Sequence, residues 1–354
     1  MISVIYNNDV YLDPVVTSVT WSGDITQAAR RLEVSLKNTV DGVKQALEIE
    51  LGRELRLYSD GDELFRGIIF AHDINARGDM TITAYDEAIY LTKNMDTRKF
   101  TAMTASSIIR QLCTEFGVEI GEIADTSYVI PKLILRDKTL WDMMTIALTE
   151  TRKQNGRRFW LTARAGALSL IERGEKRVDW ILENGTNILD ASYSQSIEDM
   201  RNQVRVIGGD EDKAPISVTV KDSALIDRFG TMQHLERMGS DAKQAEVAQL
   251  ARQLLDQLSK ITDEARVEAL GNVEVTAGTA VYVIEEMTRI VGGFYVITDS
   301  HTWRNGVHRM SLTVSGDESL PRLDYDEPPA AKQKKKKGAN KDEYAAALAR
   351  LGSE

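Results

Sequence analysis

The sequence predicts a mainly β protein in which a small α+β domain is inserted between two related antiparallel β-barrel domains, followed by a disordered C-terminal tail. Three observations predict this class: runs of alternating polar and apolar residues at both ends, helical apolar stripes in the middle, and a glycine spacing that occurs twice. The chain has 354 residues, of which 42% are hydrophobic, so it can form more than one core.

The N-terminal region, residues 1–98, is expected to form the first barrel. Its runs of alternating polar and apolar residues are short and are separated by turn residues, such as the Asp60-Gly61 pair. The expected strands are 17–24, 31–36, 47–51, 55–58, 64–70 and 80–85. Several short strands at close spacing are typical of a small barrel or sandwich.

The middle region, residues 99–188, reads as the α+β insert. Thr104 can cap a helix that ends near Gly117, and Thr139 can cap a second helix that Gly156 ends. Two β runs follow at 158–162 and 167–171, joined by an Ala-Gly turn.

β character resumes in residues 189–320, which are expected to form the second barrel. The expected strands are 202–209, 216–220, 265–270, 280–284, 294–297 and 310–314. A helix is expected at about 241–260, because its leucines, valine and alanines recur at helical spacing.

The last segment, residues 321–354, is expected to be a Pro/Lys-rich tail without fixed structure unless it binds a partner. It contains the basic run Lys332–Lys337 and a short Ala-rich stretch. From residue 332 onward seven basic and three acidic residues give a net charge of +4. The whole chain has a net charge of −10, so residues 1–331 carry −14. Such an acidic body argues against a sequence-reading nucleic-acid binder, whose contact surface is basic.

A repeat links the two β regions. Gly52 and Gly67 are 15 residues apart, as are Gly278 and Gly293, and similar strands follow each pair. The repeat predicts two related domains, although any antiparallel meander can produce such a pattern by chance.

Histidine and cysteine offer few candidates for chemistry. His301 and His308 flank the expected turn at Asn305-Gly306, so they are expected on one face of a hairpin. Zinc needs three or four protein ligands, and no third is indicated, so we expect packed or surface histidines. Cys113, the only cysteine, lies on the apolar side of a helical stripe and is expected to be a buried thiol.

The remaining motifs are equally weak. Asp60 with Asp62 and Glu285 with Glu286 resemble glycosidase carboxylate pairs, but pairs are common among 54 acidic residues. The pairs Gly208-Gly209 and Gly292-Gly293 lack the lysine of a phosphate-binding loop. We therefore predict no catalytic, cofactor-binding or metal-binding residue and no cofactor. No secretory signal and no apolar run of about 20 residues occurs, so no membrane insertion is expected.

Several stretches together resemble a known family. They are Val19–Asp24, Ala29–Val34, Glu63–Phe70, Ala84–Asn94, Thr104–Ile109 and Arg201–Val206. Over residues 1 to about 316 the chain resembles the baseplate hub proteins of PBSX-like prophages and contractile tails, the XkdQ/YqbQ type.

The resemblance implies a structural protein of a phage tail or tailocin, made in the host bacterial cytoplasm. Such a hub forms a trimeric ring with two tail-tube-like barrels per chain, which joins a hexameric tail tube to a three-fold central spike. Implied partners are further copies of the chain, the tube and spike proteins, the tape measure, a LysM-type hub and wedge or baseplate proteins. DNA would pass without sequence-specific contact.

Two alternatives from other classes stay open. One is a tail-associated cell-wall hydrolase, and the other is an assembly chaperone or DNA-organising protein absent from the finished particle. A zymogram tests the first, and analysis of purified tails tests the second.

Overall fold

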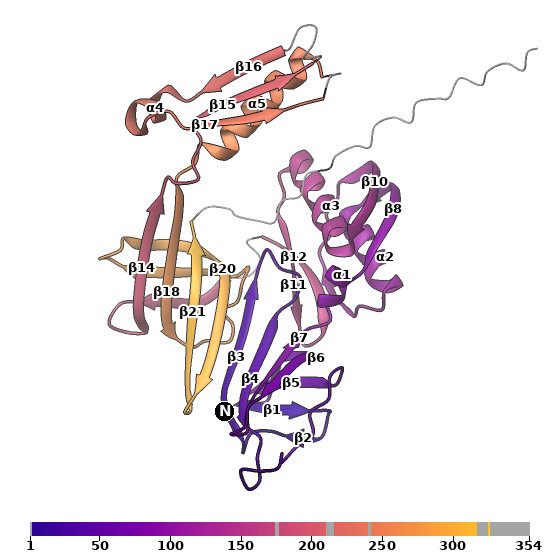
Figure 1. The fold of residues 1–354 in the computed structure, drawn as a ribbon, viewed down its shortest axis with the longest axis vertical. Helices are drawn as coiled ribbons and strands as arrows, with labels where there is room; N and C mark the ends of the chain where they lie inside the picture. The colour runs from indigo at the N-terminus through magenta and orange to yellow at the C-terminus, as the bar shows by residue number, and fades with distance from the viewer. Residues whose placement is uncertain (1, 174–176, 210–215, 240–241, 317–324, 326–354) are drawn as a thin grey trace, which may run out of the picture.

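The computed structural model describes residues 2–173, 177–209, 216–239, 242–316 and 325. In this part of the chain most strands join one large sheet, and three smaller sheets and five helices accompany it (Figure 1). The mainly β class with an α+β insert is therefore confirmed.

The first half of the large sheet comes from the N-terminal region. In spatial order its strands are β3 (Val16–Asp24), β4 (Arg31–Lys37), β7 (Asp79–Tyr85), β6 (Asp62–Ile74), β5 (Glu54–Ser59), β1 (Ile2–Tyr6) and β2 (Val10–Tyr11). Every second residue points into one core, where Val34 and Ile82 are fully buried. This side-chain alternation is the origin of the period-two pattern in the sequence.

The second half comes from residues after 176. In spatial order its strands are β14 (Ile188–Ser196), β18 (Thr262–Leu270), β21 (Val307–Ser315), β20 (Ile290–Arg304), β19 (Ala280–Glu285) and β13 (Arg177–Glu183). They surround a separate core that contains Val267 and Leu312. The halves differ at one end, because β13 runs parallel to β19, whereas β1 runs antiparallel to β5.

The two halves have the same strand order, so the predicted repeat is confirmed. Each long strand, β6 or β20, has a register break against its next neighbour in the same half, β7 or β21, and this break follows Ile69 in β6 and Val296 in β20. These breaks make Gly67 equivalent to Phe294. The expected pairing of Gly67 with Gly293 was therefore wrong by one residue, because equal glycine spacing does not record the register between strands.

The barrels do not close in the part of the chain that the structure describes. Instead β20 pairs with β3, and the two halves form one continuous sheet of 13 strands. Figure 1 shows each half as a rolled sheet, with β20 lying beside β3. The sequence cannot reveal this pairing, because it joins residues more than 250 positions apart.

The α+β portion lies between the halves in sequence. Its elements are α1 (Ile89–Lys93), β8 (Met95–Thr104), α2 (Ala105–Glu115), β9 (Ile120–Ile123), β10 (Val129–Thr139), α3 (Leu140–Asn155), β11 (Phe159–Arg164) and β12 (Ala167–Glu172). The side chains of Thr104 and Thr139 accept backbone hydrogen bonds at the N-termini of α2 and α3, and Gly156 ends α3 with φ +72°. Both predicted helices are confirmed, together with their caps.

A further small module sits between β14 and β18. It contains β15 (Gln203–Gly208), β16 (Ile216–Lys221), α4 (Ser223–Phe229), β17 (Gln233–Arg237) and α5 (Gln244–Leu258). Val247 and Ala251 of α5 pack on Val204 and Val206 of β15. The predicted helix is confirmed, whereas its strands form a separate sheet instead of part of a barrel.

The expected strand at 47–51 was wrong. The main chain of Ala46 and Leu47 hydrogen-bonds to the Asn38 side chain, and the Glu50 N–H donates to the Tyr6 hydroxyl. Side chains thus replace a partner strand. The Lys-rich run and the Ala-rich stretch lie outside the described residues. No described helix has the length and hydrophobicity that a membrane span requires.

We propose three structural domains with boundaries near 1–98, 99–188 and 189–320, and a tail from 321 to 354. Within this division β13, which the sequence assigns to the insert, pairs with β19 of the second half.

Candidate assembly interface

The two halves meet in what we call the internal joint, the antiparallel pairing of β3 with β20. It runs from Asp24 opposite Thr298 to Ser18 opposite Arg304. Main-chain pairing of this kind connects two otherwise separate cores. It also fixes the position of every other strand in the two half-sheets.

A buried ion pair lies inside the internal joint. The Arg30 guanidinium donates to both carboxylate oxygens of Asp299, with Nη1 to Oδ1 at 2.9 Å, and the two side chains are 8% and 0% exposed. The guanidinium carbon also lies 4.0 Å from the Trp21 ring centroid. Asp299 accepts a further hydrogen bond from the Ala277 N–H at 2.6 Å. Because a buried charge needs its partner in place, this pair favours a single register of β3 against β20.

Asp86 holds the main chain that carries Arg30. Its carboxylate accepts hydrogen bonds from the Arg30 N–H at 2.8 Å and the Ala88 N–H at 3.0 Å. Burial raises the pKa of Asp86 to about 7, although these hydrogen bonds oppose the shift. Asp86 therefore links the start of α1 to the joint.

The two candidate histidines lie together at the internal joint. His301 Nε2 is 2.9 Å from the Val275 carbonyl and donates to it, so His301 Nδ1 accepts from His308 Nε2 at 3.1 Å. The His308 ring stacks on Trp303 at 4.1 Å between centroids. A Cβ at Gly271 would lie 2.1 Å from the same ring. The expected position on one face of a hairpin is confirmed. Among the described residues no three His, Cys, Asp or Glu side chains are arranged so that they could hold a metal ion.

This histidine pair predicts acid lability. Burial, with a smaller contribution from His301, lowers the pKa of His308 to about 4, against an ordinary value of 6.5. The unfolded chain therefore takes up the proton first, and stability is lost as the pH falls from about 6.5 to 4. Because His308 is only partly buried, we expect it to contribute a loss of about 2 kcal/mol, below the ~3 kcal/mol of a fully shielded group. The raised pKa of Asp86 acts in the opposite direction over this pH interval, so the contribution of His308 is read from the difference between the parent and a His308 variant.

Urea unfolding at pH 7 and at pH 4.5 measures this loss. His308→Gln keeps an amide donor toward His301 and removes the titrating ring, so its stability should fall less than that of the parent protein. Equal losses in both proteins would contradict the assignment.

Two strand edges of the joined sheet have no partner strand within the described part of the chain, one along β14 and one along the second part of β6. In the described residues β14 pairs only with β18, and the part of β6 after Ile69 pairs only with β7. β14 is the counterpart of β3, and this part of β6 is the counterpart of the part of β20 that pairs with β3. Leu189 and Tyr193 of β14 are 48% and 42% exposed. The molecule thus exposes the two edges that correspond to its own internal joint.

A groove of about 790 Å³ borders the open edge of β14. Its lining includes Tyr193, Asp263, Phe294 and Met287, and Met287 is 89% exposed. At the equivalent place in the first half, Trp21 and Arg30 are covered by β20 residues. The groove therefore marks the place where no described strand covers the second half, whereas β20 covers the equivalent place in the first half.

The carboxylate pairs and the cysteine have structural roles. Burial raises the pKa of Cys113 to about 11, which disfavours the thiolate. The Glu285 carboxylate accepts hydrogen bonds from the Thr288 hydroxyl and from the Thr288 and Met287 N–H groups of its turn, and these contacts lower its pKa. Asp60 lies in the tight turn between β5 and β6 with φ 51°. The glycine pairs lie at the end of β15 and inside β20.

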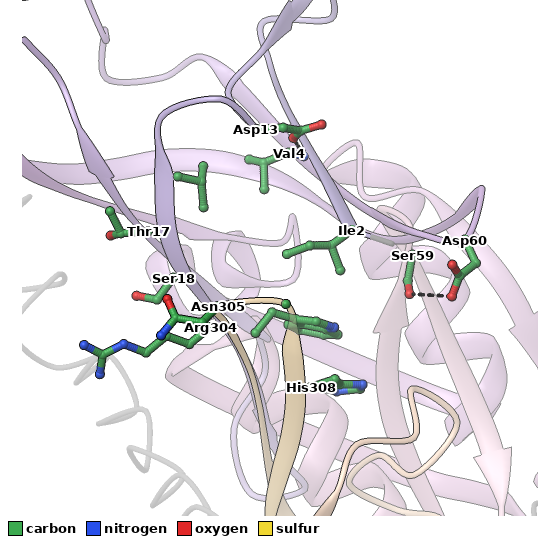
Figure 2. A pocket seen from close by; sticks show the side chains of 13 residues that line it. Ile2, Val4, Asp13, Thr17, Ser18, Ser59, Asp60, Arg304, Asn305 and His308 are labelled. Carbon is green, nitrogen blue, oxygen red and sulfur yellow. Dashed lines mark hydrogen bonds between the residues drawn. The ribbon is translucent and has the colours of Figure 1, made fainter.

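A second pocket, of about 480 Å³, lies between β1, β3 and the tip of the β20–β21 hairpin. Figure 2 shows Asp13, Asp60 and His308 spread around it. Asp13 accepts hydrogen bonds from the Val4 N–H and the Ser3 hydroxyl, both at 2.7 Å. His308 points toward His301. The polar groups of this pocket hold the fold together and form no nucleophile–base arrangement among the described residues.

Sequence reasoning missed the residues that matter most here. Arg30 and Asp299 carry no local motif, and 269 positions separate them. One signal was available in the sequence. Arg30 directly precedes an expected strand and Asp299 follows an apolar β run, and charged residues at such positions are rarely buried unless they are paired.

Comparison with known proteins identifies the relatives of this fold. The family model described as YQBQ-like matches residues 19–315. The chain belongs to the YQBQ-like family. The YQBQ-like chain is 31% identical to the phage-like element PBSX protein XkdQ of Bacillus subtilis strain 168, over 88% of this chain and 95% of XkdQ. It is 30% identical to YqbQ of the same strain, with the same coverage. The resemblance seen in the sequence is confirmed.

A solved structure shares the fold. The 43 kDa tail protein of prophage MuSo2 from Shewanella oneidensis superposes with a TM-score of 0.66 and 14% identity, over 88% of this chain and 97% of that one. The YQBQ-like fold is thus that of a prophage tail protein.

Proposed function

We propose that this YQBQ-like protein is the structural hub of a contractile tail baseplate, without enzymatic activity. Three copies form a ring with pseudo-six-fold symmetry that joins a hexameric tail tube to a three-fold central spike. The observation that carries the proposal is the duplicated half-sheet whose internal joint has an unpaired counterpart at each end.

The ring follows from repeating the internal joint between copies. If β14 of one copy pairs with β6 of the next, as β3 pairs with β20 inside the chain, each contact uses two different edges, and three copies form a closed ring when the rotations between neighbours complete one turn. Three chains then contribute six equivalent half-sheets. Closure also covers edges that otherwise favour aggregation.

Strand equivalence gives the register of this contact. Trp21 corresponds to Tyr193, and His301 corresponds to Ile74, so Tyr193 would face Ile74 of the next copy. By the same rule Ser194 would face Asp73.

The polar groups at the proposed contact can pair. Arg30 and Asp299 of the internal joint correspond to Asp263 and His72. A carboxylate would again face a nitrogen-bearing side chain that can donate a hydrogen bond to it. His72 and Asp263 are both exposed in the single chain, so a neighbouring copy would bury them.

The face of the large sheet that points away from the cores suits a channel. At the internal joint it carries the short hydroxyl side chains of Ser18, Thr20, Ser22, Ser300 and Thr302. Charges beside the joint are paired on the surface, for example Arg31 with Glu33 and Lys37 with Asp79. Such a surface offers few strong contacts to a passing polymer, which supports transit of DNA without sequence specificity.

The remaining partners follow from this role. The tube protein and the spike protein contact opposite faces of the ring, and the tape measure, a LysM-type hub and wedge proteins contact it in the baseplate. The protein is made in the bacterial cytoplasm and resides in the virion or tailocin particle.

A cysteine pair tests the ring. Opposite Cα atoms of antiparallel strands are about 4.5–5.5 Å apart, within the range of a disulfide. Ser194 and Asp73 are exposed, and the native Cys113 is buried. Under oxidation the double variant Ser194→Cys/Asp73→Cys should give covalent dimers and trimers on a non-reducing gel, and no longer ladder.

Two controls sharpen this test. The double variant Ser192→Cys/Asp73→Cys shifts one partner by two residues on the same face and should cross-link much less. Light scattering with and without the spike protein gives the oligomeric state independently. A trimer in solution without cross-links would reject this interface, and a monomer in every condition, together with absence from purified tails, would reject the hub.

A further inference from the structure

The strongest unassigned contact joins the far C-terminal region to the α+β portion. The Tyr325 hydroxyl accepts a hydrogen bond from the Ile134 N–H at 3.1 Å, across 191 positions. The Tyr325 ring also packs against the core formed by α2, α3 and β10. A residue that lies ten positions beyond the end of β21 is therefore held against a different part of the protein.

The contact occupies an open strand edge. In the described residues β10 pairs only with β8, so its other edge has no partner strand. The Ile134 N–H points from that edge and finds its acceptor in Tyr325. An unpaired strand edge of this kind is a site for an added extended segment.

The surface around the contact is basic, and the segment around Tyr325 is acidic. Lys132 and Arg136 flank Ile134 on β10, and Lys99 lies directly opposite it on β8; all three are exposed. In the sequence Asp324 precedes Tyr325, and Asp326 and Glu327 follow it. The two surfaces thus have opposite charge at the point where a described contact already joins them.

We propose that residues 324–327 of this chain dock on the outer edge of β10, with Tyr325 as the anchor and with Lys99, Lys132 and Arg136 facing the acidic side chains. The occupant is this segment of the same chain. The inference does not depend on the hub proposal, because it concerns only contacts within one copy.

Hydrogen exchange of the full chain tests the docking. The Ile134 amide should exchange about fivefold or more faster in Tyr325→Phe, which loses only the acceptor, because a single net hydrogen bond has about that effect. A chain ending at residue 322 should show the same or a larger increase, and 1 M salt should reproduce part of it by screening the charges. Amides of β3 should be unchanged in both variants and serve as the control for folding.

The charges have their own variant. Replacing Asp324, Asp326 and Glu327 by their amides should increase exchange at Ile134 and remove its salt dependence. Equal exchange at Ile134 in the full chain and in the shortened chain would overturn the proposal. Protection that persists in Tyr325→Phe but disappears in the shortened chain would overturn the anchor role of the hydroxyl.

Discussion

Asp299→Ala is expected to lower the free energy of unfolding by about 3–5 kcal/mol. The change removes the carboxylate that pairs with Arg30 and leaves a guanidinium of 8% exposure without its counter-charge. It also removes the acceptor of the Ala277 N–H. Denaturant unfolding followed by tryptophan fluorescence measures the loss, because Trp21 lies directly against Arg30.

The residue after Arg30 provides a matched control. Arg31 forms an ion pair with Glu33, and the two side chains are 47% and 38% exposed, so Glu33→Ala should lower the free energy of unfolding by less than about 0.5 kcal/mol. Asp299→Asn keeps an acceptor for Ala277 and should fall between the two. An Asp299→Ala protein within about 1 kcal/mol of the parent would show that the pair does not hold the halves together.

Gly67→Ala is expected to destabilise the first half by about 3 kcal/mol, at the upper end of typical overpacking costs. A Cβ at this position would lie 2.3 Å from the Tyr85 carbonyl oxygen and 2.5 Å from Phe65 Cζ. The carbonyl belongs to the main chain of β7, which cannot move without breaking its pairing with β4 and β6.

Gly293 provides the control, because it is also a glycine within a long strand of its half. No atom lies within 4 Å of a Cβ built there, so Gly293→Ala should change the stability by less than about 0.5 kcal/mol. Thermal unfolding of both variants makes the comparison. Equal destabilisation by the two changes would mean that loss of glycine itself, and not the clash with β7, is responsible.

The features that the sequence predicted correctly are local ones. The caps at Thr104 and Thr139 and the stop at Gly156 depend on groups within four positions of each other, so a single window of sequence contains the whole signal. The period-two strands β4 and β7 were predicted because one face of each is fully buried.

The features that were missed depend on distant or charged residues. β8 and β10 are the most extensively paired strands of the insert, but Lys99 and Arg136 on their exposed faces obscure the alternation. The internal joint has no local signature, because each half satisfies its own hydrophobic pattern and the groups that connect the halves, the β3–β20 pairs and the ion pair of Arg30 with Asp299, lie far apart in the sequence. The assembly edges were inferred only after the strand order of the two halves was known.

The internal joint also sets the order of events during synthesis. At about 5–20 residues per second, the ribosome adds Asp299 some tens of seconds after Arg30, because 269 positions separate them. Until then β3 has only β4 beside it, and Arg30 lacks its counter-charge. The edge of β3 therefore stays open until β20 has been synthesised, and a product truncated before β20 keeps this open edge. The joint between the halves can thus form only after most of the chain has been made.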